Sequence, residues 1–196
     1  MWNIKTPGIP DELFDRDEGV PITKEEVRVV QISKARLKPG MIVYDIGCGS
    51  GSISVEAALQ VEHSGHVHAI DNDVKAIELT KKNLTKFGIT NVSMVNKDAN
   101  ESVSELPEAD AIFIGGTGKE TKEIVRLCQD KLKQGGRIVI GMILIETIFS
   151  VLSLIQELSF NSVDITQVTI SKSRKTSTGT MMLARNPVTI LSATKN

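Results

Sequence analysis

The chain is organised around Val43-Tyr44-Asp45-Ile46-Gly47-Cys48-Gly49-Ser50-Gly51. This stretch predicts a buried strand, 41–46, then a loop with glycine at every second position and a helix that begins near Ser52. Glycine permits positive φ angles, and it lets a ligand approach the backbone because it carries no Cβ. The free N–H groups at the start of the helix can hold the polar end of that ligand. The pattern therefore predicts a ligand-binding loop, with a tight turn that binds nothing as the alternative.

The residues around this loop indicate the kind of ligand. A dinucleotide-binding loop has the pattern G-x-G-x-x-G/A, but here Ser52 occupies the third small position. Asp45, two residues before the first glycine, would stand at the mouth of the site, where it repels a pyrophosphate and attracts a cationic amino-acid head group. We therefore expect S-adenosylmethionine, which carries no phosphate, as the cofactor.

Asp71 is the acid that such a cofactor requires. It stands twenty residues after Gly51 and closes a second predicted strand, 66–70. In nucleotide-binding folds an acid at this place accepts hydrogen bonds from the ribose hydroxyls. Asp71 could instead cap the next helix, although Asp73 is better placed for that role.

Composition limits the function further. The 196 residues are enough for one domain with a sizeable core, and a net charge of −1 gives no general attraction for nucleic acid. Residues 161–196 nevertheless hold five basic side chains and one acid, a surface that either attracts an anionic substrate or is simply solvated.

Cysteine and histidine usage predicts neither a disulfide nor a metal site. The two cysteines form no CxxC pattern, so they are expected to be free thiols in a reducing compartment. His63, His66 and His68 have no Cys or carboxylate at ligand spacing beside them. There is no apolar signal core, and apolar runs are far shorter than the about 20 residues of a membrane span. We therefore expect a soluble, cytoplasmic protein.

Hydrophobic periodicity predicts a single domain, 1–196, with an arm or lid at 1–22. A helix is expected after Pro21, with Thr23 and Glu26 spaced as a capping box. Further strands are predicted at 92–96, 109–114 and 137–143, alternating with helices, and one more helix spans about 148–158. Such alternation is typical of an α/β fold, a doubly wound, mostly parallel seven-stranded sheet of Rossmann-like type. The tail adds two strand-like runs, 163–171 and 180–184, as an antiparallel hairpin around a polar loop at 172–179.

These features resemble the class I S-adenosylmethionine-dependent methyltransferases over nearly the whole chain. The resemblance is closer to the decarboxylating precorrin methyltransferases of cobalamin biosynthesis, and it rests on Pro21–Arg28, Asp45–Gly51, Gly115–Gly118, Gly179-Thr180-Met181-Met182 and Arg185-Asn186-Pro187. It implies a homotetramer that transfers a methyl group to carbon-15 of an anionic tetrapyrrole macrocycle and removes carbon dioxide from the ring C acetate.

The resemblance also implies a set of cofactor contacts: Thr23, Gly47, Cys48, Gly49, Ser50, Gly51, Asp71 and Ala99. For the substrate, ligands of open α/β sheets sit beyond the carboxyl ends of the strands, which places Gly116 and Thr117 near the reacting carbon. Lys172, Arg174 and Lys175 are the candidates for a basic rim that binds the substrate carboxylates. Methyl transfer depends chiefly on alignment, so no catalytic acid or base is assigned.

Two other functions fit the same loop. An RNA methyltransferase that acts on a ring nitrogen could use the basic tail, but only 4% of the residues are aromatic and no separate RNA-binding domain is visible. A non-catalytic S-adenosylmethionine-binding protein would keep the fold without a substrate of its own. We expect a small-molecule substrate and neither nucleic acid nor membrane as a partner.

Overall fold

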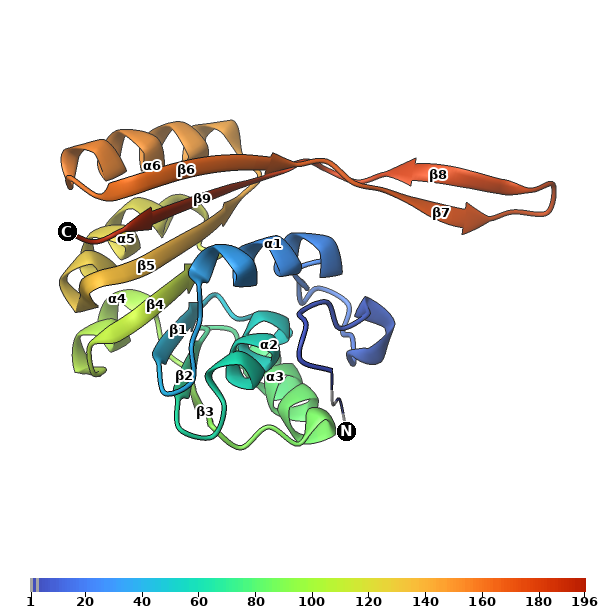
Figure 1. The fold of residues 1–196 in the computed structure, drawn as a ribbon. Helices are drawn as coiled ribbons and strands as arrows, with labels where there is room; N and C mark the ends of the chain where they lie inside the picture. Colours follow the sequence, from blue (N-terminus) through green and yellow to red (C-terminus); the bar gives the residue numbers. More distant parts are fainter. Residues whose placement is uncertain (1, 3) are drawn as a thin grey trace.

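The computed structural model describes residues 2 and 4–196, and its centre is a seven-stranded sheet (Figure 1). The strand order is β3-β2-β1-β4-β5-β9-β6. The strands are β1 (Ile42–Ile46), β2 (His66–Ile70), β3 (Val92–Val95), β4 (Ala109–Ile114), β5 (Leu132–Met142), β6 (Asn161–Val168) and β9 (Val188–Thr194). The first five are parallel, and β9 runs antiparallel to both of its neighbours. The predicted fold class, a doubly wound and mostly parallel sheet, is confirmed.

Helices cover both faces of this sheet (Figure 1). One face carries α1 (Glu25–Ala35), α2 (Ser52–Val61) and α3 (Val74–Phe87), and the other carries α4 (Ala99–Ser102), α5 (Thr121–Lys131) and α6 (Ile145–Glu157). Short 3₁₀ turns lie at η1 (Asp11–Leu13), η2 (Val103–Glu105) and η3 (Gly118–Glu120). Because both faces are buried, the central strands are almost continuously apolar, as parallel strands usually are.

The alternation of side chains along β1 gives each face its own core. Tyr44 and Ile46 pack in the layer beneath α5 and α6, whereas Val43 packs in the layer beneath α1 and α2. Since neighbouring side chains of a strand point to opposite faces, Asp45 shares the face of Val43. There it accepts a 2.5 Å hydrogen bond from the hydroxyl of Ser54, in α2. An acid next to the glycine loop is therefore placed inside the molecule.

Most predicted elements are confirmed within one or two residues. β5 is the exception in the parallel part, because it begins at Leu132 and not near residue 137. Leu132 pairs with Ala109, and Arg137 pairs with Ala111, so the chain bulges between them. Gly135 lies in this bulge with φ 74°, a conformation that favours glycine.

The helix start at α1 differs from the prediction. Lys24 is the N-cap residue, but its side chain makes no capping hydrogen bond to the helix. The expected capping box of Thr23 and Glu26 is therefore wrong. Asp11 takes over the role, since its Oδ1 accepts a 2.9 Å hydrogen bond from the backbone N–H of Glu25. The cap comes from the N-terminal arm, which sequence spacing within the helix cannot reveal.

The N-terminal arm is fastened to the body by a buried ion pair. Arg28 is 0% exposed, and its Nε donates a 2.6 Å hydrogen bond to Glu56, in α2. Its two terminal nitrogens donate to the backbone carbonyls of Thr23 and Ile9. Glu56 in turn accepts hydrogen bonds from the N–H groups of Gly8 and Ile9, at 2.9 and 3.0 Å. The arm and the segment 21–23 are thus held in fixed positions.

The C-terminal part contains two strands that the periodicity does not predict. The expected polar loop, 172–179, includes β7 (Ser171–Lys175), which pairs with β8 (Thr180–Ala184) in a separate antiparallel ribbon. This ribbon projects from the body (Figure 1). The seventh strand of the sheet is β9, inserted between β5 and β6, and not the run 180–184. An antiparallel hairpin is therefore present, as predicted, but it joins β7 to β8 outside the sheet. The run 163–171, its predicted first strand, lies mostly in β6, which pairs with β9 instead. None of the described helices is both long and apolar enough to cross a membrane.

Candidate active site

Two glycine loops meet at the carboxyl ends of β1 and β4. Gly47 has φ 72°, and a Cβ at this residue would lie only 1.9 Å from the carbonyl oxygen of Gly115. A Cβ on Gly49 would lie 2.7 Å from the carbonyl oxygen of Pro21, which accepts a 3.1 Å hydrogen bond from the N–H of Ser50. Glycine is therefore required for these loops and the arm to pack together. The result is a closely packed wall for the cavities beside it.

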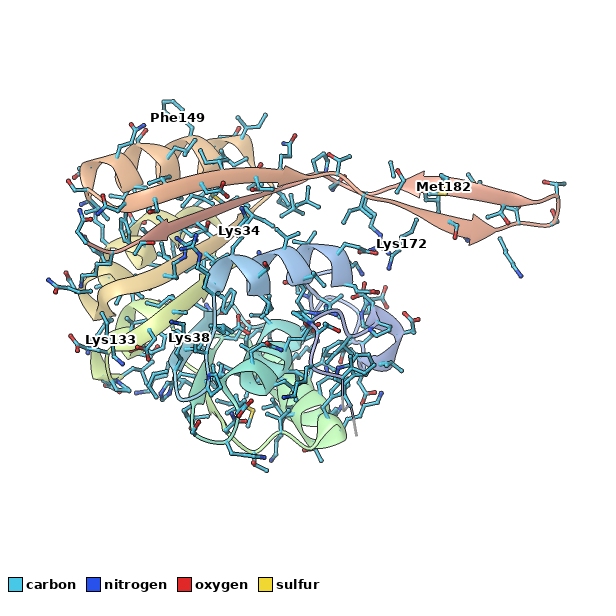
Figure 2. All side chains as sticks on the ribbon, in the orientation of Figure 1. Lys34, Lys38, Lys133, Phe149, Lys172 and Met182 are labelled. Atoms are coloured by element: carbon cyan, nitrogen blue, oxygen red, sulfur yellow. The ribbon has the colours of Figure 1, made fainter. Side chains whose placement is uncertain are left out.

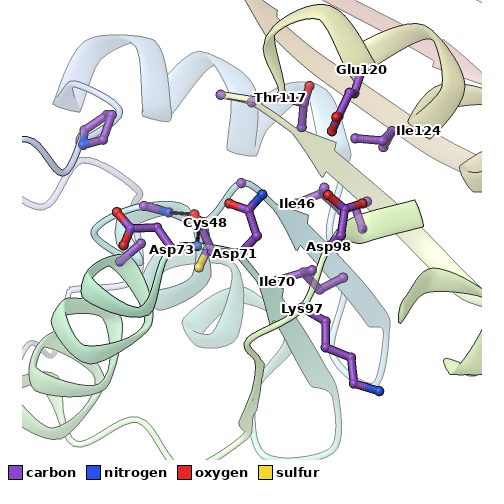
Figure 3. A pocket seen from close by; sticks show the side chains of 18 of the residues that line it. Ile46, Cys48, Ile70, Asp71, Asp73, Lys97, Asp98, Thr117, Glu120 and Ile124 are labelled. Atoms are coloured by element: carbon purple, nitrogen blue, oxygen red, sulfur yellow. Dashed lines mark hydrogen bonds between the residues drawn. The ribbon is translucent and has the colours of Figure 1, made fainter. Parts of the chain in front are cut away.

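The first of two adjoining cavities, here called the acidic pocket, has a volume of about 290 Å³ (Figure 3). It is lined by parts of the arm and the glycine loop and by residues 70–73, 97–99 and 115–117. Asp71 is held firmly here: its Oδ2 accepts a 2.9 Å hydrogen bond from the N–H of Gly49, and its Oδ1 accepts a 3.0 Å bond from the N–H of Asp73. Each carboxylate oxygen keeps a further lone pair for a ligand.

The charges of the acidic pocket suit a nucleoside without phosphates. Asp98 contributes a second carboxylate, which accepts a 2.8 Å hydrogen bond from the N–H of Asn100. Lys97 is the one basic residue among the described lining residues, and its side chain extends away from Asp71 and Asp98 (Figure 3). Together with Asp73 and Glu120, which also line this pocket, these two carboxylates favour hydroxyl donors and disfavour a pyrophosphate. These hydrogen-bond acceptors therefore fit S-adenosylmethionine.

The second cavity, here called the apolar pocket, has a volume of about 430 Å³. It shares residues 21–23, 47–48 and 115–117 with the acidic pocket. Its remaining wall comes mainly from Val27 and Gln31 of α1, Phe113 of β4, residues 141–144 and Val188 of β9. Asp45 is the only carboxylic acid, and there is no Lys, Arg or His, among its described lining residues. A polar and an apolar cavity thus meet at one boundary.

The ionisable groups at this boundary are buried. Burial raises the pKa of Asp45 to about 6; the hydrogen bond from Ser54 opposes this effect, and the charge of Asp71 adds to it. Burial likewise raises the pKa of the Cys48 thiol, whose sulfur lies 3.5 Å from Oγ1 of Thr80. Cys48 is therefore a neutral thiol at neutral pH and lines the boundary without acting as a nucleophile.

The structure brings most of the predicted site residues together. Those that line the acidic pocket are Thr23, Gly47, Cys48, Gly49, Asp71, Ala99, Gly116 and Thr117. Ser50 and Gly51 lie outside both pockets, because the chain turns there towards α3: Ser50 is 1% exposed, and a Cβ on Gly51 would lie 2.8 Å from Thr80. Asp45 is 3% exposed and buried beneath the loop, so its expected place at the mouth of the site is wrong.

The predicted basic rim does not line either pocket of this chain. Lys172, Arg174 and Lys175 lie on β7, in the projecting ribbon. Lys172 stands where the ribbon leaves the body (Figure 2), and its Nζ pairs with Glu25 at 3.2 Å and with Glu26 at 2.5 Å. Hydrogen bonding to Glu26 raises the pKa of Lys172. The charge of Lys172 is thus already balanced by α1.

Sequence reasoning misses the apolar pocket almost entirely. Its wall includes residues of three separate elements, Gln31, Phe113 and Val188. The hydrophobic periodicity of each element is explained equally well by burial in the core. The one available signal is Gly141, which interrupts an apolar strand without a turn around it. A glycine inside a strand often marks a close approach by another group.

The sheet order and the paired pockets define a class I methyltransferase. A family model described as a precorrin methyltransferase domain matches residues 12–195, and the chain belongs to that family. It is 48% identical to a probable cobalt-precorrin-6B C(15)-methyltransferase (decarboxylating) of Saccharolobus solfataricus, over 99% of this chain and 98% of that protein.

Two solved structures are similar to the whole fold. A precorrin 8W decarboxylase of Methanobacterium thermoautotrophicum has a TM-score of 0.89 and 37% identity, covering 94% of this chain and 98% of its own. A precorrin-6y C5,15-methyltransferase of Geobacter metallireducens GS-15 has a TM-score of 0.89 and 33% identity, covering 97% of this chain and 98% of its own. The family expected from the sequence motifs is thereby confirmed.

Proposed function

We propose that this protein is a decarboxylating C-methyltransferase of cobalamin biosynthesis. Its methyl donor is S-adenosylmethionine, and its substrate is cobalt-precorrin-6B or precorrin-6B, methylated at carbon-15 with loss of the ring C acetate as carbon dioxide. The product is then cobalt-precorrin-7 or its metal-free equivalent. The observation that carries the proposal is the 48% identity, over almost the full length of both chains, to a relative named for this reaction.

The residues divide the work between the two pockets. When bound, S-adenosylmethionine supplies a methyl group on a sulfonium. Asp71 has free lone pairs for the ribose hydroxyls, and Ala99 begins α4, where a backbone N–H can meet the adenine edge. The glycine loop and Thr23 stand between the acidic and the apolar pocket. This arrangement supports an in-line transfer across the shared boundary, where alignment supplies much of the rate.

Product analysis tests the proposal directly. Purified protein is incubated with cobalt-precorrin-6B and methyl-labelled S-adenosylmethionine, and the product is examined by mass spectrometry. We expect one labelled methyl group gained and one carboxyl group lost per turnover. Binding of S-adenosylmethionine without either change would favour a non-catalytic protein. Transfer of the label to transfer RNA, in a parallel incubation with that RNA, would favour the RNA methyltransferase.

We further propose that the protein is a cytoplasmic homotetramer. The ribbon of β7 and β8, which projects from the body (Figure 2), supports an assembly. Met181, Met182 and Leu183 on this ribbon are 47, 63 and 38% exposed. Exposed apolar side chains that stand together on a projection are typical of protein interfaces. Joining chains through this ribbon would remove these side chains from water.

A further inference from the structure

The apolar pocket has an unusual charge balance for an enzyme with a polycarboxylate substrate. No Lys, Arg or His is found among its described lining residues, and the one acid is Asp45. Asp71 and the neutral thiol of Cys48 are the other ionisable groups beside Asp45. A carboxylate that enters this pocket loses its water and gains no counterion there.

One neutral donor nevertheless reaches into this pocket. Gln31 of α1 is 6% exposed and lines the cavity. Its Nε2 lies where a side chain of Gly141 would begin, only 2.3 Å from the position of a Cβ on that residue. Glycine at this point of β5 therefore makes room for the carboxamide. No protein partner hydrogen-bonds to the carboxamide of Gln31 in the described part of the chain, and its atoms are not among the fully buried polar atoms that lack a partner, so the carboxamide is open to the cavity.

We propose that Gln31 holds the carboxylate that is lost as carbon dioxide, and that the absence of a cationic side chain beside this carboxylate promotes decarboxylation. This inference rests on the proposed function. The carboxamide N–H₂ donates to the acetate carboxylate of ring C and so fixes its orientation. The apolar wall surrounds it and withholds water.

The chemical step is balanced without a further reactant. The bond between the methylene carbon and the carboxylate breaks, and carbon dioxide leaves as a neutral molecule. The electron pair of that bond enters the macrocycle, which the added methyl group has left one pair short. The exocyclic carbon takes up one proton from water to become a methyl group, and the macrocycle returns one proton to water.

A neutral holder has a specific advantage over a cation here. The negative charge leaves the carboxylate as the bond breaks, so a cation at this place would stabilise the ground state more than the transition state. An amide orients the group with much less of this penalty, because its hydrogen bond carries no net charge. Asp45 acts in the same direction when ionised, since it also disfavours a bound carboxylate.

The test separates methyl transfer from carbon dioxide release. Gln31→Lys and Gln31→Met are compared with wild type for labelled methyl transferred and carbon dioxide released from cobalt-precorrin-6B. Matched controls are Gln156→Lys and Gln156→Met, at an exposed position of α6. Thermal unfolding and S-adenosylmethionine affinity are measured for every variant, so that a folding defect is recognised.

We expect the ratio of carbon dioxide to methyl to fall about tenfold in both Gln31 variants, the size of one lost or misdirected hydrogen bond to a charged group. A methylated product that keeps its acetate should accumulate, while both controls keep the wild-type ratio. An unchanged ratio in well-folded Gln31 variants would overturn the inference, and so would an equal loss of both activities. If wild type itself neither methylates nor decarboxylates, the proposed function fails instead.

Discussion

At the scale of the single residue, Asp71 holds the glycine loop and has the proposed role of binding the cofactor. Its carboxylate accepts the N–H groups of Gly49 and Asp73 while it faces the acidic pocket. We expect Asp71→Ala to weaken S-adenosylmethionine binding by at least about tenfold, because hydrogen bonds to a charged acceptor are lost. Isothermal titration calorimetry measures the affinity, and Asp130→Ala on the exposed side of α5 is the control. Unchanged affinity would remove Asp71 from the site.

Asp45 gives a prediction about pH. Burial raises its pKa in the folded protein to about 6 from the ordinary aspartate value of 3.8, so folding favours the protonated form. The stability that this gives is fully present below about pH 4 and is lost as the pH rises through about 6. Asp45→Asn should therefore be more stable than wild type at pH 8, by up to about 3 kcal/mol, and should show no such gain at pH 4.

Urea unfolding at the two pH values measures this difference. The matched control is Asp130→Asn, which changes an exposed carboxylate. A gain for Asp45→Asn that is the same at both pH values would show that the charge of Asp45 is not its cause.

The sequence predicts the site best where backbone geometry leaves little choice. The contacts of the loop require glycine at positions 47 and 49, so the glycine pattern in the sequence predicts the place of the site. Ser50 obeys the same pattern, yet the chain has already turned away from the pockets at this residue. Gln31 has no local signal, because its role depends on a glycine in a strand that lies far along the chain.

Among the structural elements, the arm depends on the buried side chain of Arg28, which forms ion pairs with Glu56 and with Asp11. Arg28 and Glu56 are 0% and 1% exposed and lie 2.6 Å apart. Removing one partner leaves a buried charge, so Arg28→Ala should lower the free energy of unfolding by about 3–5 kcal/mol. Arg126→Ala is the control: it breaks an exposed pair with Glu157 at 2.9 Å, whose loss is expected to change the free energy of unfolding little or not at all. Equal losses in urea unfolding would contradict this account of the arm.

The ribbon gives a prediction about the substrate. Because Lys172, Arg174 and Lys175 lie outside both pockets of their own chain, replacing all three by Gln should leave the substrate KM within about twofold of wild type. Steady-state kinetics at saturating S-adenosylmethionine measures this. A clear rise in KM at unchanged cofactor affinity would mean that the ribbon reaches the pocket of a neighbouring chain.

At the same scale, the helices and parallel strands are largely readable from the sequence and the ribbon is not. The parallel strands are buried on both faces, so their apolar runs are long and bounded by turns. β7 is charged and exposed on most positions, which gives no hydrophobic period to detect. β9 has seven residues, of which three are Thr or Ser, so its apolar pattern is irregular. In addition, nothing local distinguishes a strand that inserts between two others from one that extends an edge.

For the whole molecule, the proposed homotetramer makes the ribbon a structural requirement. Met181→Lys with Met182→Lys would place charges on its exposed apolar part, and we expect the tetramer to dissociate into smaller species. Light scattering after size-exclusion chromatography measures the mass. Lys119→Glu, at η3, is a control that also changes surface charge. A tetramer that survives the double substitution must be joined elsewhere.

The place of β9 also has a consequence for how the chain is made. β9 lies between β5 and β6 in the sheet, although it follows both of them in the chain. On the ribosome, β6 and the whole ribbon emerge before the strand that must separate β6 from β5. The gap in the sheet can close only when residues 188–194 have been synthesised, so this edge of the sheet is completed only after β9 has left the ribosome.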